Sequence, residues 1–413
     1  MNKPNWFFIF ITFAIIAIST SFLIAITPSQ ANNSTGDVLI SSVLKAKYNL
    51  AKQGGPKIKV LIVPGHDPKD GGAEYKQVKE RTLNVALADE LKNYLINQGV
   101  FDVMVARDEK NYNPILQNYF ETNKETIQKF VLESPQRYTE MIYDSDFETR
   151  EGVIHPTATP DVALKLYGIN KYVSENNIDL VIHVHFNNYP RRNNRQPGKY
   201  KGFTIYVPDR QFDNGPVSQE IAGAILDELN IFWPKSNLPK ESEGIIHDQK
   251  LIAIGSANTL KQPSVLIEYG YIYESQFKEK KIRDLILKEM AYKTYCGLIN
   301  FFEDKTVKKN FESTLLSPLA TTTLHLNDKN TNVLYLESAL LKLGFYPPSS
   351  RYSSTTADTA PLKDLNLYRC PLDGVFGKCT TLSLKEFQKS NNLKADGVAG
   401  LKTIEKINSL LGF

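Results

Sequence analysis

Three apolar segments of the sequence each end in side chains that could bind a metal or move a proton. His66 follows KVLIVPG, His183 and His185 lie within DLVIHVHF, and Glu268 ends SVLIE. In open α/β sheets, ligands bind beyond the carboxyl ends of the strands, so these side chains are expected to converge with Glu80 on one spot. Two histidines and a glutamate around one point make a metal site with an open position.

Each of these residues also has an ordinary structural explanation. A single histidine after a strand is more often a hydrogen-bonded loop residue than a ligand. Glu80 could be a solvated helix residue, and Glu268 could cap a loop. However, Glu80 starts the apolar face of its helix, where a buried carboxylate needs a partner. His183 and His185 share one strand face; His185 is nearer the strand end and is the better ligand, and His183 is expected to support it.

The predicted elements alternate between strands and helices. Apolar residues spaced by three and four predict a helix over 75–98, and similar spacing predicts helices over 161–176 and 216–229. Strands are predicted at 60–63, 101–107, 179–186, 202–207 and 264–270. This alternation predicts an α/β fold with a mostly parallel sheet flanked by helices.

Three further segments depart from this alternation. Residues 108–160 form a polar, aromatic-rich insertion, predicted to be a helical subdomain over the sheet edge because so long a structureless loop is uncommon. Residues 305–329 lack periodicity and are predicted to be a linker. Within residues 330–413, the pattern D-G-V-x-G-x-x-T occurs at 373–380 and again at 396–403, each time before a helical segment. A small all-α domain is therefore predicted, either a binding module or a packing unit.

The N-terminus carries features of a targeting segment. Lys3 precedes an apolar or small run from Trp6 to Ile26, and Ser29-Gln30-Ala31 is typical of a small-x-small cleavage site. We favour a signal peptide over residues 1–31 rather than a retained N-terminal anchor, which the run is just long enough to form. Either way, the bulk of the chain is expected to be extracytoplasmic, whether secreted, periplasmic or associated with the cell wall.

Charge and cysteine content narrow the function classes only a little. The 49 Lys and Arg residues nearly balance the 45 Asp and Glu residues, so charge gives no reason to expect nucleic-acid binding. Cys370 and Cys379 flank a short loop and could form a bridge in an oxidising compartment. The alternative is that both, like Cys296, are small apolar fillers.

The motifs, taken in order, carry a family resemblance. GHDPKDGGA with Glu80, then DLVIHVHFNN, then PSVLIEYGYI resemble the signatures of the zinc-dependent N-acetylmuramoyl-L-alanine amidases, cell-wall hydrolases of bacteria and their phages, over about residues 58–304. Residues 330–413 similarly resemble the helical peptidoglycan-binding domain that accompanies such hydrolases. The resemblance implies that His66, Glu80 and His185 bind Zn²⁺ and that Glu268 is catalytic.

That resemblance implies hydrolysis of the amide bond between N-acetylmuramic acid and L-alanine, with Glu268 taking the proton of a zinc-activated water. Peptidoglycan is the expected partner, with room for an activator protein and with membrane contact only through an N-terminal anchor. His183 departs from the serine that is usual in the family, which leaves open a swapped or additional metal ligand at this position. Either His183 or His247 could also assist as an oxyanion donor. The insertion could block the cleft or form a substrate platform.

Two other functions stay open at this point. The same metal chemistry would serve a zinc peptidase that cuts the stem peptide. A catalytically inactive cell-wall binding protein would be signalled by loss of a ligand, and here all four key positions are filled.

Overall fold

The structure is a computed structural model that describes residues 41–69, 71–144, 147–152, 158–188, 196–255, 261–305, 312–348 and 368–413. The chain divides into two units, Met1–Gly36 and Asp37–Phe413. The first unit, with the predicted signal or anchor, lies outside the described residues. None of the helices in the described ranges has the length and apolar composition needed to cross a membrane.

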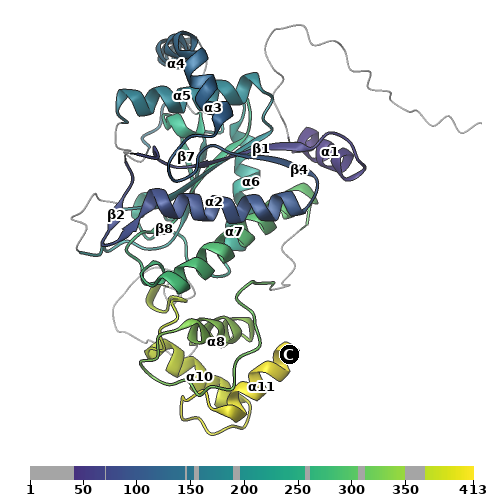
Figure 1. The fold of residues 1–413 in the computed structure, drawn as a ribbon, viewed down its shortest axis with the longest axis vertical. Coiled ribbons are helices and arrows are strands. Elements are labelled where there is room, and N and C mark those ends of the chain that lie inside the picture. Colours follow the sequence, from purple (N-terminus) through teal and green to yellow (C-terminus); the bar gives the residue numbers. More distant parts are fainter. Residues whose placement is uncertain are drawn as a thin grey trace, which may run out of the picture. The chain divides into compact units, whose positions relative to one another are not determined.

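A six-stranded sheet with the order β4-β1-β5-β8-β6-β7 forms the centre of the fold (Figure 1). All neighbouring strands pair in parallel except β6 and β8, which are antiparallel. The fold class predicted from the sequence is confirmed. The strands are β1 (Ile58–Pro64), β4 (Phe101–Val105), β5 (Leu180–Asn187), β6 (Thr204–Pro208), β7 (Ile245–Asp248) and β8 (Ser264–Tyr271).

Helices cover both faces of this sheet. One face carries α2 (Glu80–Asn97), α6 (Gly215–Leu229) and α7 (Lys280–Phe302), with α1 (Ser41–Lys52) against α7 and β1. The other face carries α5 (Pro160–Glu175), whose Ile169 and Val173 pack on Leu61 and Val181 of the sheet. Short 3₁₀ turns lie at η1 (Pro239–Glu241), η2 (Ile252–Ile254) and η4 (Ser275–Phe277).

The helix predicted over 75–98 is wrong at its start, because α2 begins at Glu80. The preceding residues instead form a small antiparallel pair, β2 (Glu74–Tyr75) and β3 (Val78–Lys79). Tyr75 and Val78 are buried there, so their apolar spacing reflects a hairpin and not a helix turn. As a result Glu80 is the first helical residue, and its backbone N–H donates to the carbonyl of Ala73 at 2.9 Å.

The insertion contains two helices, α3 (Pro114–Thr122) and α4 (Lys124–Asp144). It is helical as predicted, but α3 and α4 pack mainly against α5, which itself lies over the sheet face. Leu116 of α3 is buried against this helix together with Tyr119 and Phe120. Figure 1 shows these three helices stacked on the same side of the sheet.

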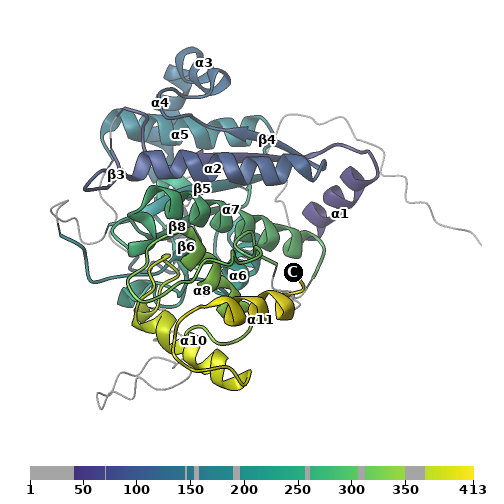
Figure 2. The same cartoon turned by 60° about the horizontal axis from the view of Figure 1, so that its bottom comes forward.

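The C-terminal domain contains α8 (Thr331–Lys342), α10 (Lys378–Ser390) and α11 (Leu401–Leu411), which lie together in Figure 2. The two repeated loops are held in the same way. Glu337 of α8 accepts from Gly374 N at 3.0 Å, and Gln388 of α10 accepts from Gly397 N at 2.9 Å. A disulfide joins Cys370 to Cys379, so the bridge alternative is the one that the structure contains.

The described part of the predicted linker divides between two neighbours. Thr314 donates to Glu289 of α7 through its N–H at 2.7 Å and its hydroxyl at 2.6 Å. In contrast, the backbone N–H of Leu319 donates to Oδ1 of Asn408 in α11 at 2.8 Å, and Nδ2 of Asn408 donates to the carbonyl of Leu319 at 3.0 Å. The change of neighbour falls near Ser317, which marks a structural boundary between the catalytic part and the C-terminal domain.

Candidate metal and catalytic site

The turn after β1 sets the position of His66. His66 has a φ of 67°, in the left-handed region that residues other than glycine seldom adopt. The carbonyl of Gly65 accepts hydrogen bonds from Asn84 Nδ2 at 3.1 Å and from the buried Arg107 guanidinium. Arg107 Nε also donates to the carbonyl of Pro64 at 3.0 Å. These bonds hold the backbone that directs His66 toward the site.

Glycines make room for both imidazole rings. A Cβ on Gly65 would lie 2.1 Å from Cε1 and 2.2 Å from Nε2 of His185, so a larger residue would displace this ring. Gly71 and Gly72 have φ values of 88° and 84°. A Cβ on Gly72 would lie 3.1 Å from Cδ2 of His66. The glycines of this loop therefore let the backbone approach the two rings closely.

Glu80 brings the two histidines together. Its Oε1 lies 2.8 Å from Nε2 of His66 and 3.2 Å from Nδ1 of His185. Its Oε2 accepts the backbone N–H of Ala73 at 2.7 Å, and Oε1 accepts that of Phe186 at 3.2 Å. One nitrogen or oxygen from each of His66, Glu80 and His185 can be chosen so that all three lie within 4.8 Å of one another.

The charges of this cluster suit cation binding. Burial would raise the pKa of Glu80, but the facing rings of His66 and His185 outweigh burial and lower it. Burial lowers the pKa of His185, against the opposite effect of its contact with Glu80. An ionised carboxylate and a neutral imidazole are the forms that bind metals.

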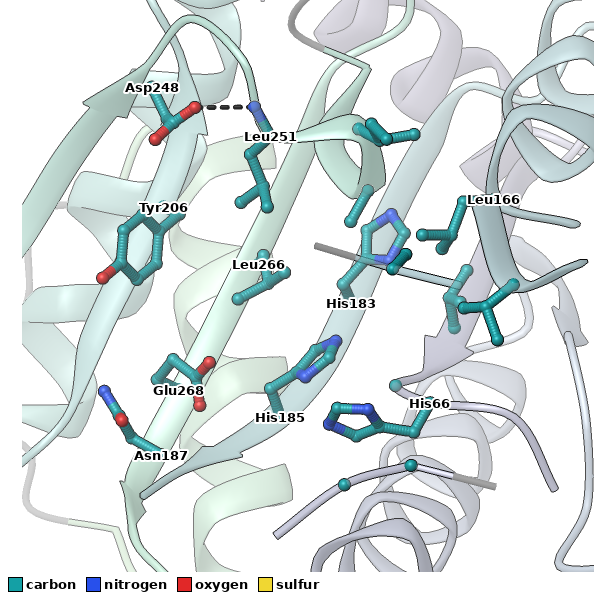
Figure 3. A pocket seen from close by; sticks show the side chains of 18 of the residues that line it. His66, Leu166, His183, His185, Asn187, Tyr206, Asp248, Leu251, Leu266 and Glu268 are labelled. Atoms are coloured by element: carbon teal, nitrogen blue, oxygen red, sulfur yellow. Dashed lines mark hydrogen bonds between the residues drawn. The ribbon is translucent and has the colours of Figure 1, made fainter. Parts of the chain in front are cut away.

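Glu268 lies beside the cluster on the neighbouring strand. In the parallel pairing of β5 with β8, His185 stands opposite Glu268, and Figure 3 shows the two side chains close together. The Oε2 atom of Glu268 is buried and has no hydrogen-bond partner among the described residues. Burial, together with the negative charges of Glu80 and Glu241, raises the pKa of this carboxyl well above its usual value. Such a group can hold a proton and release it to a neighbour.

A cleft of about 1410 Å³ opens over these residues. The sequence-predicted residues that line it are His66, Glu80, His183, His185 and Glu268. His183 lies deeper than the metal cluster and is 1% exposed. Burial, with a smaller contribution from His185, lowers the pKa of His183 to about 3. His247 lies on β7 and is absent from the described lining, so the structure does not bring it to the cleft.

Sequence reasoning missed the residues that support this site from outside it. Arg107 holds the Gly65 carbonyl. The sequence carried a signal for this role, because Arg107 ends the predicted strand 101–107 and so lies at the same sheet edge as His66. Asp67 follows His66 directly and accepts hydrogen bonds from Lys165 of α5 and from Tyr112 at 3.3 Å. Burial opposes ionisation of Asp67, but Lys165 and its other donors lower its pKa. No sequence pattern indicated that Lys165 would reach this loop.

Comparison with known proteins agrees with this geometry. The N-acetylmuramoyl-L-alanine amidase family matches residues 60–133 and 137–300, more than half of the chain. A putative peptidoglycan binding domain matches residues 361–407. The chain therefore belongs to the N-acetylmuramoyl-L-alanine amidase family. It is an enzyme of this class, with a peptidoglycan-binding domain at its C-terminal end.

Solved structures of similar fold include amidases from three bacteria. The CwlD amidase of Clostridioides difficile, solved in complex with the GerS lipoprotein, is 16% identical with a TM-score of 0.39, over 60% of this chain and 100% of that one. Ami1 of Mycobacterium smegmatis is 13% identical with a TM-score of 0.38, and the match covers 60% of this chain and 99% of that one. The catalytic domain of CwlV from Bacillus (Paenibacillus) polymyxa is 14% identical with a TM-score of 0.37, and the match covers 60% of this chain and 99% of that one. No curated protein matches the chain in sequence.

The close approach of Gly65 to His185 can be tested by adding one methyl group. Gly65→Ala should lower kcat/KM on soluble muropeptides by about 100-fold, because the new methyl group displaces a ring that must be placed to within about 1 Å. Gly223→Ala in α6 is the matched control, since a Cβ there meets nothing within 4 Å. The control should keep full activity and gain about 0.5–1 kcal/mol of helix stability. Equal activity of the two variants would contradict the packing argument.

Proposed function

We propose that the protein is a zinc-dependent hydrolase that cleaves the amide bond between the lactyl group of N-acetylmuramic acid and L-alanine in peptidoglycan. His66, Glu80 and His185 hold the zinc ion, and Glu268 transfers the proton. The observation that carries this proposal is the cluster of three ligand atoms within 4.8 Å of one another, next to a buried carboxylate oxygen that has no partner among the described residues.

The donor set fits zinc. Two imidazole nitrogens and one carboxylate oxygen, with a position left for water, form a common catalytic zinc site. The surroundings also fit, because the ligand Glu80 is fixed by two backbone N–H groups and the loop of His66 is fixed by Arg107. Outer contacts of this kind orient ligands and support metal affinity. When bound there, zinc supplies Lewis-acid activation of the water and of the scissile carbonyl.

Proton transfer falls to Glu268. Glu268 lines the cleft, and its Oε2, which has no partner among the described residues, can accept the proton of the attacking water. The same oxygen can then donate this proton to the nitrogen of L-alanine as the amide bond breaks. The raised pKa of Glu268 favours the first of these transfers, because it makes the carboxylate a stronger base toward the water.

The site of action follows from the substrate. Peptidoglycan lies outside the cytoplasm, and the disulfide between Cys370 and Cys379 is of the kind that persists in oxidising compartments. The C-terminal domain would hold the enzyme on the wall, which raises the concentration of substrate near the catalytic cleft.

The metal assignment is tested by Glu80→Ala. Loss of this carboxylate should remove most bound zinc and abolish turnover, while the fold survives because the ligands sit on the ends of a preformed sheet. Elemental analysis measures the zinc, and circular dichroism checks the fold. Asp89→Ala, an exposed carboxylate on the same helix, is the control and should retain zinc. Full zinc occupancy in the Glu80 variant would refute the assignment.

The proton-transfer role is tested by Glu268→Gln. This change keeps the shape of the side chain and removes the base, so zinc content should stay normal. Turnover should fall by roughly 100-fold to 10,000-fold, the range that one general acid–base group contributes. Hydrolysis is followed on a soluble muropeptide across pH. Activity within about tenfold of the native enzyme would place the base elsewhere.

The role of the C-terminal domain is tested by ending the chain at Leu316, before the segment that bonds to α11. The shortened enzyme should hydrolyse soluble muropeptides normally and insoluble sacculi more slowly, because only the tethering is lost. The separate domain, starting at Ser317, should sediment with purified sacculi.

The competing role is that of a structural cap. Lys201 Nζ donates to the carbonyl of Tyr368 at 3.1 Å, and the buried core continues from the amidase part into this domain. If the domain is only a cap, the shortened enzyme will melt at a lower temperature and lose activity on both substrates. Together with that result, a separate domain that stays in the supernatant would refute the anchoring role.

A further inference from the structure

The cleft continues past the metal cluster into a compartment between α5 and the sheet. Its walls are apolar: Val162, Ala163 and Leu166 from α5, Leu251, Ile252 and Ala253 around η2, and Leu266 from β8. Figure 3 shows Leu166, Leu251 and Leu266 around the His183 ring, with His185 and His66 further along the cleft. We name this region the His183 compartment.

His183 is the polar group at the floor of this compartment. Its side chain is almost completely buried, yet it lines the cleft. Its Nε2 atom has no hydrogen-bond partner among the described residues. A buried polar atom without a partner costs free energy, typically about 1–3 kcal/mol. A group retained at this cost, on a residue that lines a cleft, suits a ligand that supplies the missing hydrogen bond.

We propose that the His183 compartment binds the N-acetyl group of the muramic acid sugar. The Nε2–H of His183 donates to the acetyl carbonyl oxygen, and the acetyl methyl packs against the apolar wall. The inference rests on the proposed function, since it names the part of the same substrate that lies beside the reacting bond. It makes His183 a specificity residue, distinct from the metal ligands and from Glu268.

The spacing along β5 favours the acetyl group. His183 and His185 are two residues apart on one strand face, so their side chains are separated by about 6–7 Å along the strand. The acetyl carbonyl carbon lies six bonds from the lactyl carbonyl carbon, which gives roughly 5–7 Å with ordinary bond lengths. A substrate whose lactyl carbonyl lies at the metal cluster can therefore place its acetyl group at His183.

Other parts of the substrate fit less well. The L-alanine methyl group is only three bonds from the scissile carbonyl carbon, too near to reach His183, and it offers no hydrogen-bond acceptor. The carboxylates further along the stem peptide carry charge, and these apolar walls would strip their hydration without replacing it. An acetamido group combines a methyl with one neutral acceptor, which is what this compartment offers.

The test measures binding, so it does not depend on turnover. The full chain carrying Glu268→Gln is titrated by calorimetry with N-acetylmuramoyl-L-alanyl-D-isoglutamine and with its N-deacetylated counterpart. The acetylated probe should bind at least about tenfold more tightly, since one hydrogen bond and a buried methyl group distinguish the two probes. No measurable binding of the acetylated probe, or equal affinity for both, overturns the proposal.

A second substitution assigns this preference to His183. His183→Leu should weaken binding of the acetylated probe by about tenfold and leave binding of the deacetylated probe unchanged. Comparing both proteins with both probes gives a double-mutant cycle, in which the lost preference measures the interaction between His183 and the acetyl group. His247→Leu is the matched control, because it removes a half-buried imidazole whose Nδ1 also lacks a partner among the described residues and which is absent from the described cleft lining. It should keep the preference. A preference retained by His183→Leu, or lost equally in the control, overturns the assignment.

Ala163→Leu provides an independent check if His183→Leu fails to fold. It fills the compartment from α5 and leaves the residues of the sheet unchanged. It should weaken only the acetylated probe, and unchanged binding overturns the proposal. Failure of the proposed function would give a different result. The native chain would then release no lactyl carboxylate from either probe, while calorimetry would still show whether the compartment prefers the acetylated probe.

Discussion

The close approach of His185 to the backbone of Gly65 is the contact on which the site depends. β1 and β5 are parallel neighbours, so the residues at their carboxyl ends lie side by side. With no side chain at Gly65, the His185 ring occupies that space and meets the carboxylate of Glu80. Arg107 and Asn84 hold the Gly65 carbonyl from the other side. The cluster of His66, Glu80 and His185 is thus fixed by backbone geometry.

This arrangement carries electrostatic costs that the structure offsets locally. Glu80 is 4% exposed, and an ionised carboxylate in such a place needs strong partners. Two backbone N–H groups and two imidazole rings provide them. Glu268 differs, because no donor among the described residues reaches its Oε2. The two carboxyl groups therefore have opposite pKa shifts, which suit the proposed roles of Glu80 as a metal ligand and of Glu268 as a proton carrier.

The sequence was sufficient for the fold class and for the proximity of the strand-end residues, because both follow from local patterns. Apolar runs ending in His66, His185 and Glu268 locate strand ends, and parallel strands bring such ends to one edge. The start of α2 was not predictable from spacing, since Tyr75 and Val78 are buried equally well by a hairpin. β7 was missed because its four residues, IIHD, are too short and polar to show a pattern. Contacts across the fold, such as Lys165 with Asp67, depend on how α5 packs.

The central claim is that this site cuts the bond between sugar and peptide. The most direct measurement is mass spectrometry of purified sacculi digested with the full-length chain and zinc. The account predicts glycan strands with free lactyl carboxylates and released peptides that begin with a new N-terminal L-alanine. New amino groups at other positions of the stem peptide would identify a peptidase, and retention on the wall without products would identify a binding protein. Either result would contradict the account.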